Sequence, residues 1–275
     1  MEFFQYDFLQ RALVAGILIA LACPLIGNFV VLRRQSMIGD GLGHIAFAGV
    51  TGGYMVGWYP AFGAFLLTLA GALGIEWLRR RHRNLADMGL AVFFYAGIAL
   101  AIIFSTMTRM PSAGLLNFLF GSILTVTNTD LALISACTCV VMLLMYRYTQ
   151  SLLLMSLDED VAKVAGVPID KINLVFSVLT AVVVVSGMMV VGILLVSALM
   201  IVPVAAAHAL GLGFRRTIAA SVLISLASVF IGLTAAFQFN IAPGGTIVMT
   251  GVALYIAASL WGRIGRSKLK NSGKA

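Results

Sequence analysis

The sequence predicts an all-α, polytopic membrane protein with about eight to nine transmembrane helices, folded as a single domain over residues 1–275. Hydrophobic residues make up 61% of the chain and charged residues only 10%, whereas a soluble domain carries roughly a quarter charged residues. Apolar stretches of roughly 20 residues, the length that crosses a bilayer, recur along the chain. The basic residues, which give a net charge of +8, gather in the short connections between these stretches. This distribution is typical of membrane topology and argues against a nucleic-acid partner.

Taken in order, the apolar stretches place transmembrane helices near residues 9–32, 37–58, 60–78, 86–107, 131–147, 172–191, 193–210, 217–238 and 246–262. The sixth and seventh are the hardest to separate, because residues 172–210 form one apolar run interrupted only by Gly187 and Gly192. Two tilted helices, or one helix and a re-entrant segment, both fit this run. Residues 115–124 are too short and too interrupted to span, so we expect them to lie at the interface or to re-enter.

The charges of the connections predict the orientation of the chain. When the nine spans are followed in order, most basic residues fall on one side of the membrane: Arg33, Arg34, Arg79, Arg80, Arg81, Arg83, Arg147, Lys163, Lys171, Arg215, Arg216, Arg263, Arg266, Lys268, Lys270 and Lys274. Only Arg11 and Arg109 fall on the other side. The positive-inside rule therefore predicts an outer amino terminus and a cytosolic carboxyl terminus.

Two short stretches on the cytosolic side do not span and could receive a soluble partner. Residues 156–168 contain three consecutive acids, which suit the amino-terminal end of a short helix, and Gly166 and Pro168 stop that helix. Residues 202–216 begin with Pro203 at a helix start and end on glycines. An ordinary loop cap is the alternative interpretation of both stretches.

Two ionisable residues inside the second span carry the strongest functional signal. Asp40 and His44 are four residues apart, so in a helix their side chains lie on one face, one turn apart. Counted at roughly 1.5 Å per residue from Arg34, Asp40 lies about 9 Å and His44 about 15 Å into the bilayer. Ionisable side chains at such depths are costly and usually mark a transport path. The structural alternative is that Asp40 pairs with Arg33 or Arg34 and that His44 binds a backbone carbonyl.

An aspartate oxygen and an imidazole nitrogen on one helix face form a two-ligand fragment suited to zinc or manganese. Zinc takes four ligands and manganese more, so the others must come from elsewhere in the chain, from water, or from a second copy across a two-fold axis. Five glycines around the pair predict either close helix contact or local unwinding: Gly39, Gly41, Gly43, Gly49 and Gly53.

Other chemistry is not supported by the sequence. The chain has no Gly-x-x-x-x-Gly-Lys-[Ser/Thr] phosphate-binding loop and no His-Glu-x-x-His motif. We therefore expect neither ATP hydrolysis nor zinc-protease activity in this chain, and no permanently bound cofactor. Glu76 and Asp87 flank the arginine cluster at residues 79–83, and we expect them to pair with it at the cytosolic surface.

Three stretches carry a resemblance to a known family. Residues 32–44, Leu-Arg-Arg-Gln-Ser-Met-Ile-Gly-Asp-Gly-Leu-Gly-His, place an aspartate and a histidine four apart after an arginine-rich turn. Residues 119–124 read Leu-Phe-Gly-Ser-Ile-Leu, and residues 192–207 run from Gly192 through Pro203. With the amino-terminal stretch, they resemble the membrane permeases of bacterial zinc and manganese ABC importers over nearly the whole chain. The family often has serine or alanine where Gly41 and Gly43 stand here.

The resemblance implies a fold similar to the vitamin B12 importer permeases and a homodimer in the bacterial plasma (inner) membrane. It implies an ATP-binding cassette subunit docked on the cytosolic side, and an extracellular or periplasmic metal-binding protein that delivers the ion. The third stretch would face the ATPase with a coupling segment formed by Pro203, Ala206, His208, Leu210, Gly211 and Arg215.

On this interpretation the chain is a permease and not an enzyme, and Asp40 and His44 bind the transported ion. Zinc is favoured over manganese because the amino-terminal stretch looks most like zinc-type members from Gram-positive bacteria, although a two-ligand fragment accepts zinc, manganese and iron alike. An ATP-independent secondary carrier or channel is the alternative, since intramembrane aspartate and histidine also serve as proton relays. A membrane scaffold or sensor without transport is a third interpretation.

Overall fold

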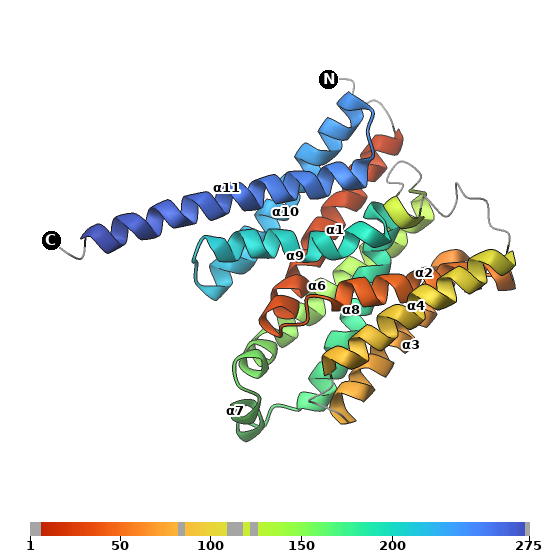
Figure 1. Cartoon of the computed structure of the whole chain (residues 1–275), viewed down its shortest axis with the longest axis horizontal. Helices are drawn as coiled ribbons and strands as arrows, with labels where there is room; N and C mark the ends of the chain where they lie inside the picture. The colour runs from red at the N-terminus through yellow and green to blue at the C-terminus, as the bar shows by residue number, and fades with distance from the viewer. Residues whose placement is uncertain (1–6, 82–85, 109–117, 122–125, 273–275) are drawn as a thin grey trace.

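The computed structural model describes residues 7–81, 86–108, 118–121 and 126–272, and the regular secondary structure of this part is entirely helical. Its helices are α1 (Asp7–Leu32), α2 (Ile38–Val56), α3 (Pro60–Arg81), α4 (Ala86–Thr108), α6 (Asn128–Leu157), α7 (Glu159–Val164), α8 (Ile169–Val191), α9 (Ile193–Ala209), α10 (Phe214–Phe239) and α11 (Pro243–Ser272). Figure 1 shows α2, α3 and α4 grouped on one side and α9, α10 and α11 on the other, with α1, α6 and α8 between them.

The helices confirm the predicted all-α, polytopic membrane fold. Each predicted span falls on one helix, and within the described residues seven helices are long and apolar enough to cross a membrane. The 19-residue α2 and the 17-residue α9 are the remaining two predicted spans. Two predicted ends were too early: α6 continues past Arg147 to Leu157, where no glycine or proline interrupts it, and α11 continues past residue 262 to Ser272. Most of the 115–124 stretch lies outside the described residues.

Contacts between helix ends show which ends lie together. Arg33, just after α1, donates a hydrogen bond of 2.9 Å to Asn173 near the start of α8. Arg80, near the end of α3, lies 3.4 Å from the Asp170 carboxylate in the first turn of α8. We call this the arginine-rich end of the molecule. The clustering of basic residues at one end agrees with the topology expected from the charges of the connections.

Glycines allow α2 to pack closely against three helices. A Cβ atom at Gly49 would lie 2.4 Å from the carbonyl oxygen of Gly63 on α3, and one at Gly39 would lie 2.9 Å from Cβ of Ser197 on α9. Gly41 faces α4 in the same way, since a Cβ there would lie 3.2 Å from Leu90. α2 is an unbroken helix from Ile38 to Val56. The glycines therefore serve close helix contact, and the alternative of local unwinding is wrong.

Replacing Gly49 with alanine should push α2 and α3 apart, because the new methyl group would meet backbone atoms that cannot rotate away. We expect the free energy of unfolding to fall by about 1–3 kcal/mol, the usual cost of overpacking. Gly245→Ala is the matched control, since a Cβ at Gly245 would meet nothing within 4 Å. Denaturant unfolding of both variants in detergent would test this, and equal stability would contradict the close α2–α3 contact.

The long apolar run of residues 172–210 forms two helices that meet at Gly192. This residue has a φ of 94°, and a Cβ atom there would lie 2.2 Å from the backbone nitrogen of Gly121. Only glycine fits such a conformation and such a close approach. The predicted helix start at Pro203 was wrong, because Pro203 lies inside α9. The missing backbone N–H of a proline is tolerated inside membrane helices where neighbouring helices pack around it.

Candidate metal site

Asp40 and His44 lie on one face of α2, as their spacing predicts, and both are half-buried. The predicted depth needs correction, because residues 33–37 form a turn and the helix begins only at Ile38. Asp40 is therefore in the first turn of α2, and His44 follows about 9 Å along the axis from the helix start. A carboxylate in the first turn is also favoured by the helix dipole.

The Asp40 carboxylate is held by a neighbouring helix and not by the adjacent arginines. The hydroxyl of Ser197 on α9 donates a hydrogen bond to Asp40 Oδ1. Within the described part of the chain, Asp40 forms no ion pair with Arg33 or Arg34. Arg33 instead binds Asn173 and lies 4.8 Å above the Phe176 ring. The structural alternative for Asp40 is therefore not supported.

The His44 imidazole packs edge-on against Phe94 of α4, with ring centroids 4.9 Å apart and an interplanar angle of 82°. No hydrogen bond from His44 to a backbone carbonyl is found among the described residues. The ring is oriented by an aromatic contact and its nitrogens are not committed to the protein. This arrangement leaves an imidazole nitrogen available to an ion beside α2.

Asp40 and His44 are two donors, fewer than the four that zinc takes. Among the residues that the structure describes, no group of three or more histidine, cysteine, aspartate or glutamate side chains could hold an ion. Asp40 and His44 supply one oxygen and one nitrogen donor, and the Ser197 hydroxyl lies beside them. The pair therefore needs further donors, from elsewhere in the chain, from water or from a second copy.

The residues predicted to face an ATPase divide into two groups. Pro203 and Ala206 are buried within α9, so their side chains are not available to a docking partner. The other four lie on or beside the α9–α10 turn: His208, Gly211 and Arg215 are exposed, and Leu210 is half-buried. The predicted surface is thus narrower than the sequence suggested, because most of residues 202–209 continue a packed helix.

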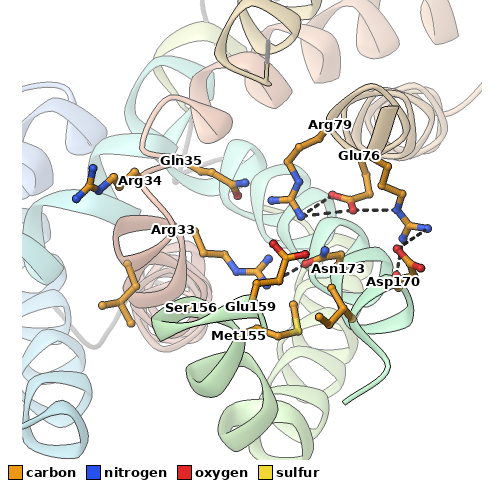
Figure 2. Close-up of a pocket in the computed structure, with 13 residues that line it drawn as sticks. Arg33, Arg34, Gln35, Glu76, Arg79, Met155, Ser156, Glu159, Asp170 and Asn173 are labelled. Atoms are coloured by element: carbon orange, nitrogen blue, oxygen red, sulfur yellow. Dashed lines mark hydrogen bonds and ion pairs between the residues drawn. The ribbon is translucent and has the colours of Figure 1, made fainter. Parts of the chain in front are cut away.

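A charged cavity of about 510 Å³ opens at the arginine-rich end (Figure 2). Glu76 lies in its wall, with only 3% of its surface exposed. Arg79 and Arg80 each approach the Glu76 carboxylate to 3.1 Å, and Arg80 also reaches Asp170 on α8. The predicted pairing of Glu76 with the arginine cluster is confirmed, although Glu76 is buried and not at the surface. The side chain of Asp87 lies outside the described residues.

Arg33, just after α1, also lines this cavity and reaches Asn173 on α8, as Figure 2 shows. Burial, and then the neighbouring charge of Arg79, lower the pKa of Arg33 to about 10, against the opposing effects of Glu76 and Glu159. The guanidinium stays protonated at neutral pH and binds Asn173. Sequence analysis identified the arginines but not Asp170 or Asn173, because nothing local marks which residues of α8 will lie opposite them.

Comparison with known proteins shows the family to which the chain is similar. Residues 5–262 match the ABC 3 transport family. A membrane protein of Treponema pallidum assigned to a metal transport system is 36% identical over 266 residues, covering 96% of this chain and 99% of that protein. The manganese transport system membrane protein MntC of Halalkalibacterium halodurans is 30% identical, covering 94% and 88%. The high-affinity zinc uptake system membrane protein ZnuB of Haemophilus influenzae is 28% identical, covering 92% and 97%.

Solved structures agree with the fold. A chain of PsaBC from Streptococcus pneumoniae, solved in complex with Fab, has a TM-score of 0.84 at 28% identity and covers 94% of this chain and 92% of that one. An inward-facing structure assigned to the metal-chelate type of ABC transporter has a TM-score of 0.67 at 16% identity, covering 91% and 85%. At 16% identity the likeness concerns the fold alone.

The absence of a phosphate-binding loop from the sequence shows which subunit of an ABC transporter this chain is. An ABC transporter hydrolyses ATP, and the Gly-x-x-x-x-Gly-Lys-[Ser/Thr] motif needed to bind the phosphates does not occur in this sequence. The ATPase is therefore a separate subunit. With a family match across residues 5–262 and relatives similar over nearly their full length, this chain belongs to the ABC 3 transport family, as the membrane subunit of an ABC transporter.

Proposed function

We propose that this chain is the permease of an ATP-driven importer that moves a divalent transition metal into the cytosol, with zinc as the first candidate and manganese as the second. Asp40 and His44 bind the ion during its passage. The observation that carries the proposal is their shared, half-buried face on α2, where Asp40 forms no ion pair with any residue that the structure describes. An intramembrane carboxylate and imidazole next to each other are explained by a cation that passes them.

Zinc is placed ahead of manganese on coordination chemistry. One imidazole and one carboxylate from each of two copies make a four-donor set, which suits the tetrahedral preference of zinc. Manganese prefers more donors and more oxygens, so it would need water in addition. Relatives of this chain include both a manganese and a zinc system membrane protein, which supports a divalent metal as the cargo class.

The proposal includes a homodimer, because a second Asp40 and His44 would raise the donors from two to four, and no group of three acid, histidine or cysteine side chains is found in the described part of one copy. A two-fold axis next to α2 would bring both pairs to one ion path. It also includes an ATP-binding cassette subunit at the arginine-rich end, docked on the α9–α10 turn through His208, Leu210, Gly211 and Arg215. A metal-binding protein would deliver the ion at the opposite end of the molecule, on the outer side of the bacterial plasma membrane. In this orientation the carboxyl terminus is cytosolic.

The ATP-independent carrier is set aside because the chain belongs to an ABC transport family. A scaffold or sensor without transport is set aside for the same reason, because the family is a transport family. Transport is therefore the function that accounts for both the family and the geometry.

Metal uptake into liposomes that contain this chain with its ATP-binding and metal-binding partner subunits would test the proposal. We expect zinc uptake only when ATP is present, and we expect excess manganese to compete less well than excess unlabelled zinc. Uptake without ATP would favour a carrier. Stronger competition by manganese would reverse the order of the two metals, and the absence of zinc, manganese and iron uptake would overturn the proposal.

A further inference from the structure

Among the described residues, Ser197 is one of two buried serines whose hydroxyl donates to a carboxylate on another helix; the other is Ser177, 3.5 Å from Glu76. Buried hydroxyl groups in this chain usually donate to the backbone carbonyl four residues earlier in their own helix, as Ser186 does to Val182 at 2.8 Å and Thr180 to Phe176 at 2.8 Å. This local bond is the default for serine and threonine where no water is present. Ser197, only 5% exposed, instead donates across helices to the Asp40 carboxylate.

Two glycines of α2 make this contact possible. A Cβ at Gly39 would lie 2.9 Å from Ser197 Cβ, and a Cβ at Gly43 would lie 3.2 Å from the Ile193 side chain. Gly39 and Gly43 are one turn apart and lie along the contact with α9. Because both lack a side chain, α9 approaches α2 closely enough for the short serine side chain to reach Asp40.

We infer that Ser197 is a positioning residue for the transported metal, an inference that rests on the proposed function. By donating to Oδ1, the Ser197 hydroxyl fixes the rotation of the Asp40 carboxylate and leaves Oδ2 to the ion. Groups that orient a metal ligand in this way typically change metal affinity by about 10- to 100-fold when they are removed. Ser197 thus affects the metal through Asp40.

The same hydrogen bond links the metal ligand to the helix that ends at the proposed ATPase contact. Ser197 lies in the first half of α9, and α9 ends at Ala209, directly before the exposed α9–α10 turn. We expect a displacement of this turn to reach Ser197 through α9 and the helices packed around it, with Pro203 as the one interruption of the α9 hydrogen bonds between the two. The Ser197–Asp40 bond is therefore the point at which a motion of α9 changes the geometry of a metal donor.

Direct zinc binding to the purified full-length permease, measured by equilibrium dialysis with zinc alone, tests the inference. We expect Ser197→Ala to raise the dissociation constant for zinc by about 10-fold or more. Ser186→Ala is the matched control, because it removes a buried serine hydroxyl whose bond stays within its own helix. We expect this control to bind zinc as the parent protein does.

A second pair of variants separates the hydroxyl from the volume of the side chain. Ser197→Thr keeps a hydroxyl donor. Ser197→Val has nearly the same shape as the threonine variant but has no hydroxyl. Tighter zinc binding by the threonine variant than by the valine variant would support a positioning role, whereas equal binding would overturn it. In the assembled transporter, Ser197→Val should also hydrolyse more ATP for each zinc ion moved than Ser197→Thr, and an equal ratio would contradict the link through α9.

The proposed function and this inference fail in different ways. If Asp40→Ala abolishes zinc binding while Ser197→Ala and Ser197→Val bind normally, only the role of Ser197 is wrong. If Asp40→Ala itself binds and transports zinc normally, the proposed metal site is wrong.

Discussion

Replacing Asp40 or His44 with alanine is expected to reduce metal uptake to the background of protein-free liposomes. Each change removes one of only two donors that this copy offers, and within the described residues no other histidine, cysteine or acid is close enough to complete a group of three. Loss of a direct ligand should exceed the roughly 10- to 100-fold effect of losing a group that only orients one. ATP-dependent uptake of radioactive zinc, with expression checked by quantitative immunoblot, measures the effect.

Two further variants refine this prediction. Asp7→Ala removes an exposed aspartate in the first turn of α1, and we expect metal uptake to be unchanged. Asp40→Asn keeps an oxygen that can accept the Ser197 hydrogen bond but loses the negative charge, so uptake should still be lost. Normal uptake by Asp40→Asn would show that the carboxylate is not a metal ligand.

The shared site can be examined with two copies joined in one polypeptide. His44→Ala in one half alone should reduce uptake strongly, because the four-donor set then loses one of its two imidazoles. Full activity of this half-substituted dimer would contradict a site shared across a two-fold axis and favour one site in each copy.

Replacing both Arg79 and Arg80 with alanine is expected to lower the free energy of unfolding by about 3 kcal/mol. Both guanidinium groups lie 3.1 Å from the Glu76 carboxylate, whose side chain is only 4% exposed. Removing one side of a buried ion pair leaves an uncompensated charge, which typically costs about 3–5 kcal/mol. Since Arg80 is 37% exposed and the cavity is open, we expect the lower end of this range.

A third substitution identifies the cause. Adding Glu76→Gln to the double variant removes the unpaired charge and should restore more than half of the lost stability. Lys163→Ala is the matched control: it breaks ion pairs with Glu159 and Asp160, but all three groups are at least 40% exposed, so we expect a change within about 0.5 kcal/mol. Unfolding by denaturant in detergent micelles measures all four proteins. Equal losses with and without Glu76→Gln would show that the buried charge is not the cause.

The sequence by itself determined the helices and the central pair of residues. Runs of apolar residues must be long enough to cross the bilayer, so each predicted span was found as a helix to within a few residues, apart from the later ends of α6 and α11. Helical periodicity placed Asp40 and His44 on one face without any knowledge of the fold. The density of glycines in α2 indicated either close packing or unwinding, and it could not separate the two.

Tertiary structure alone decided which distant residues meet. Ser197 lies 157 positions from Asp40 in the sequence. Nothing in the sequence of an apolar helix shows that a serine will donate its hydrogen bond to a distant carboxylate and not to a carbonyl of its own helix. The burial of Pro203 and Ala206, and the joining of Arg80 to Asp170, likewise depend on how α3, α8 and α9 pack. Local patterns follow from the geometry of one helix, whereas contacts between helices follow from the packing of the whole bundle, and only the folded chain contains that information.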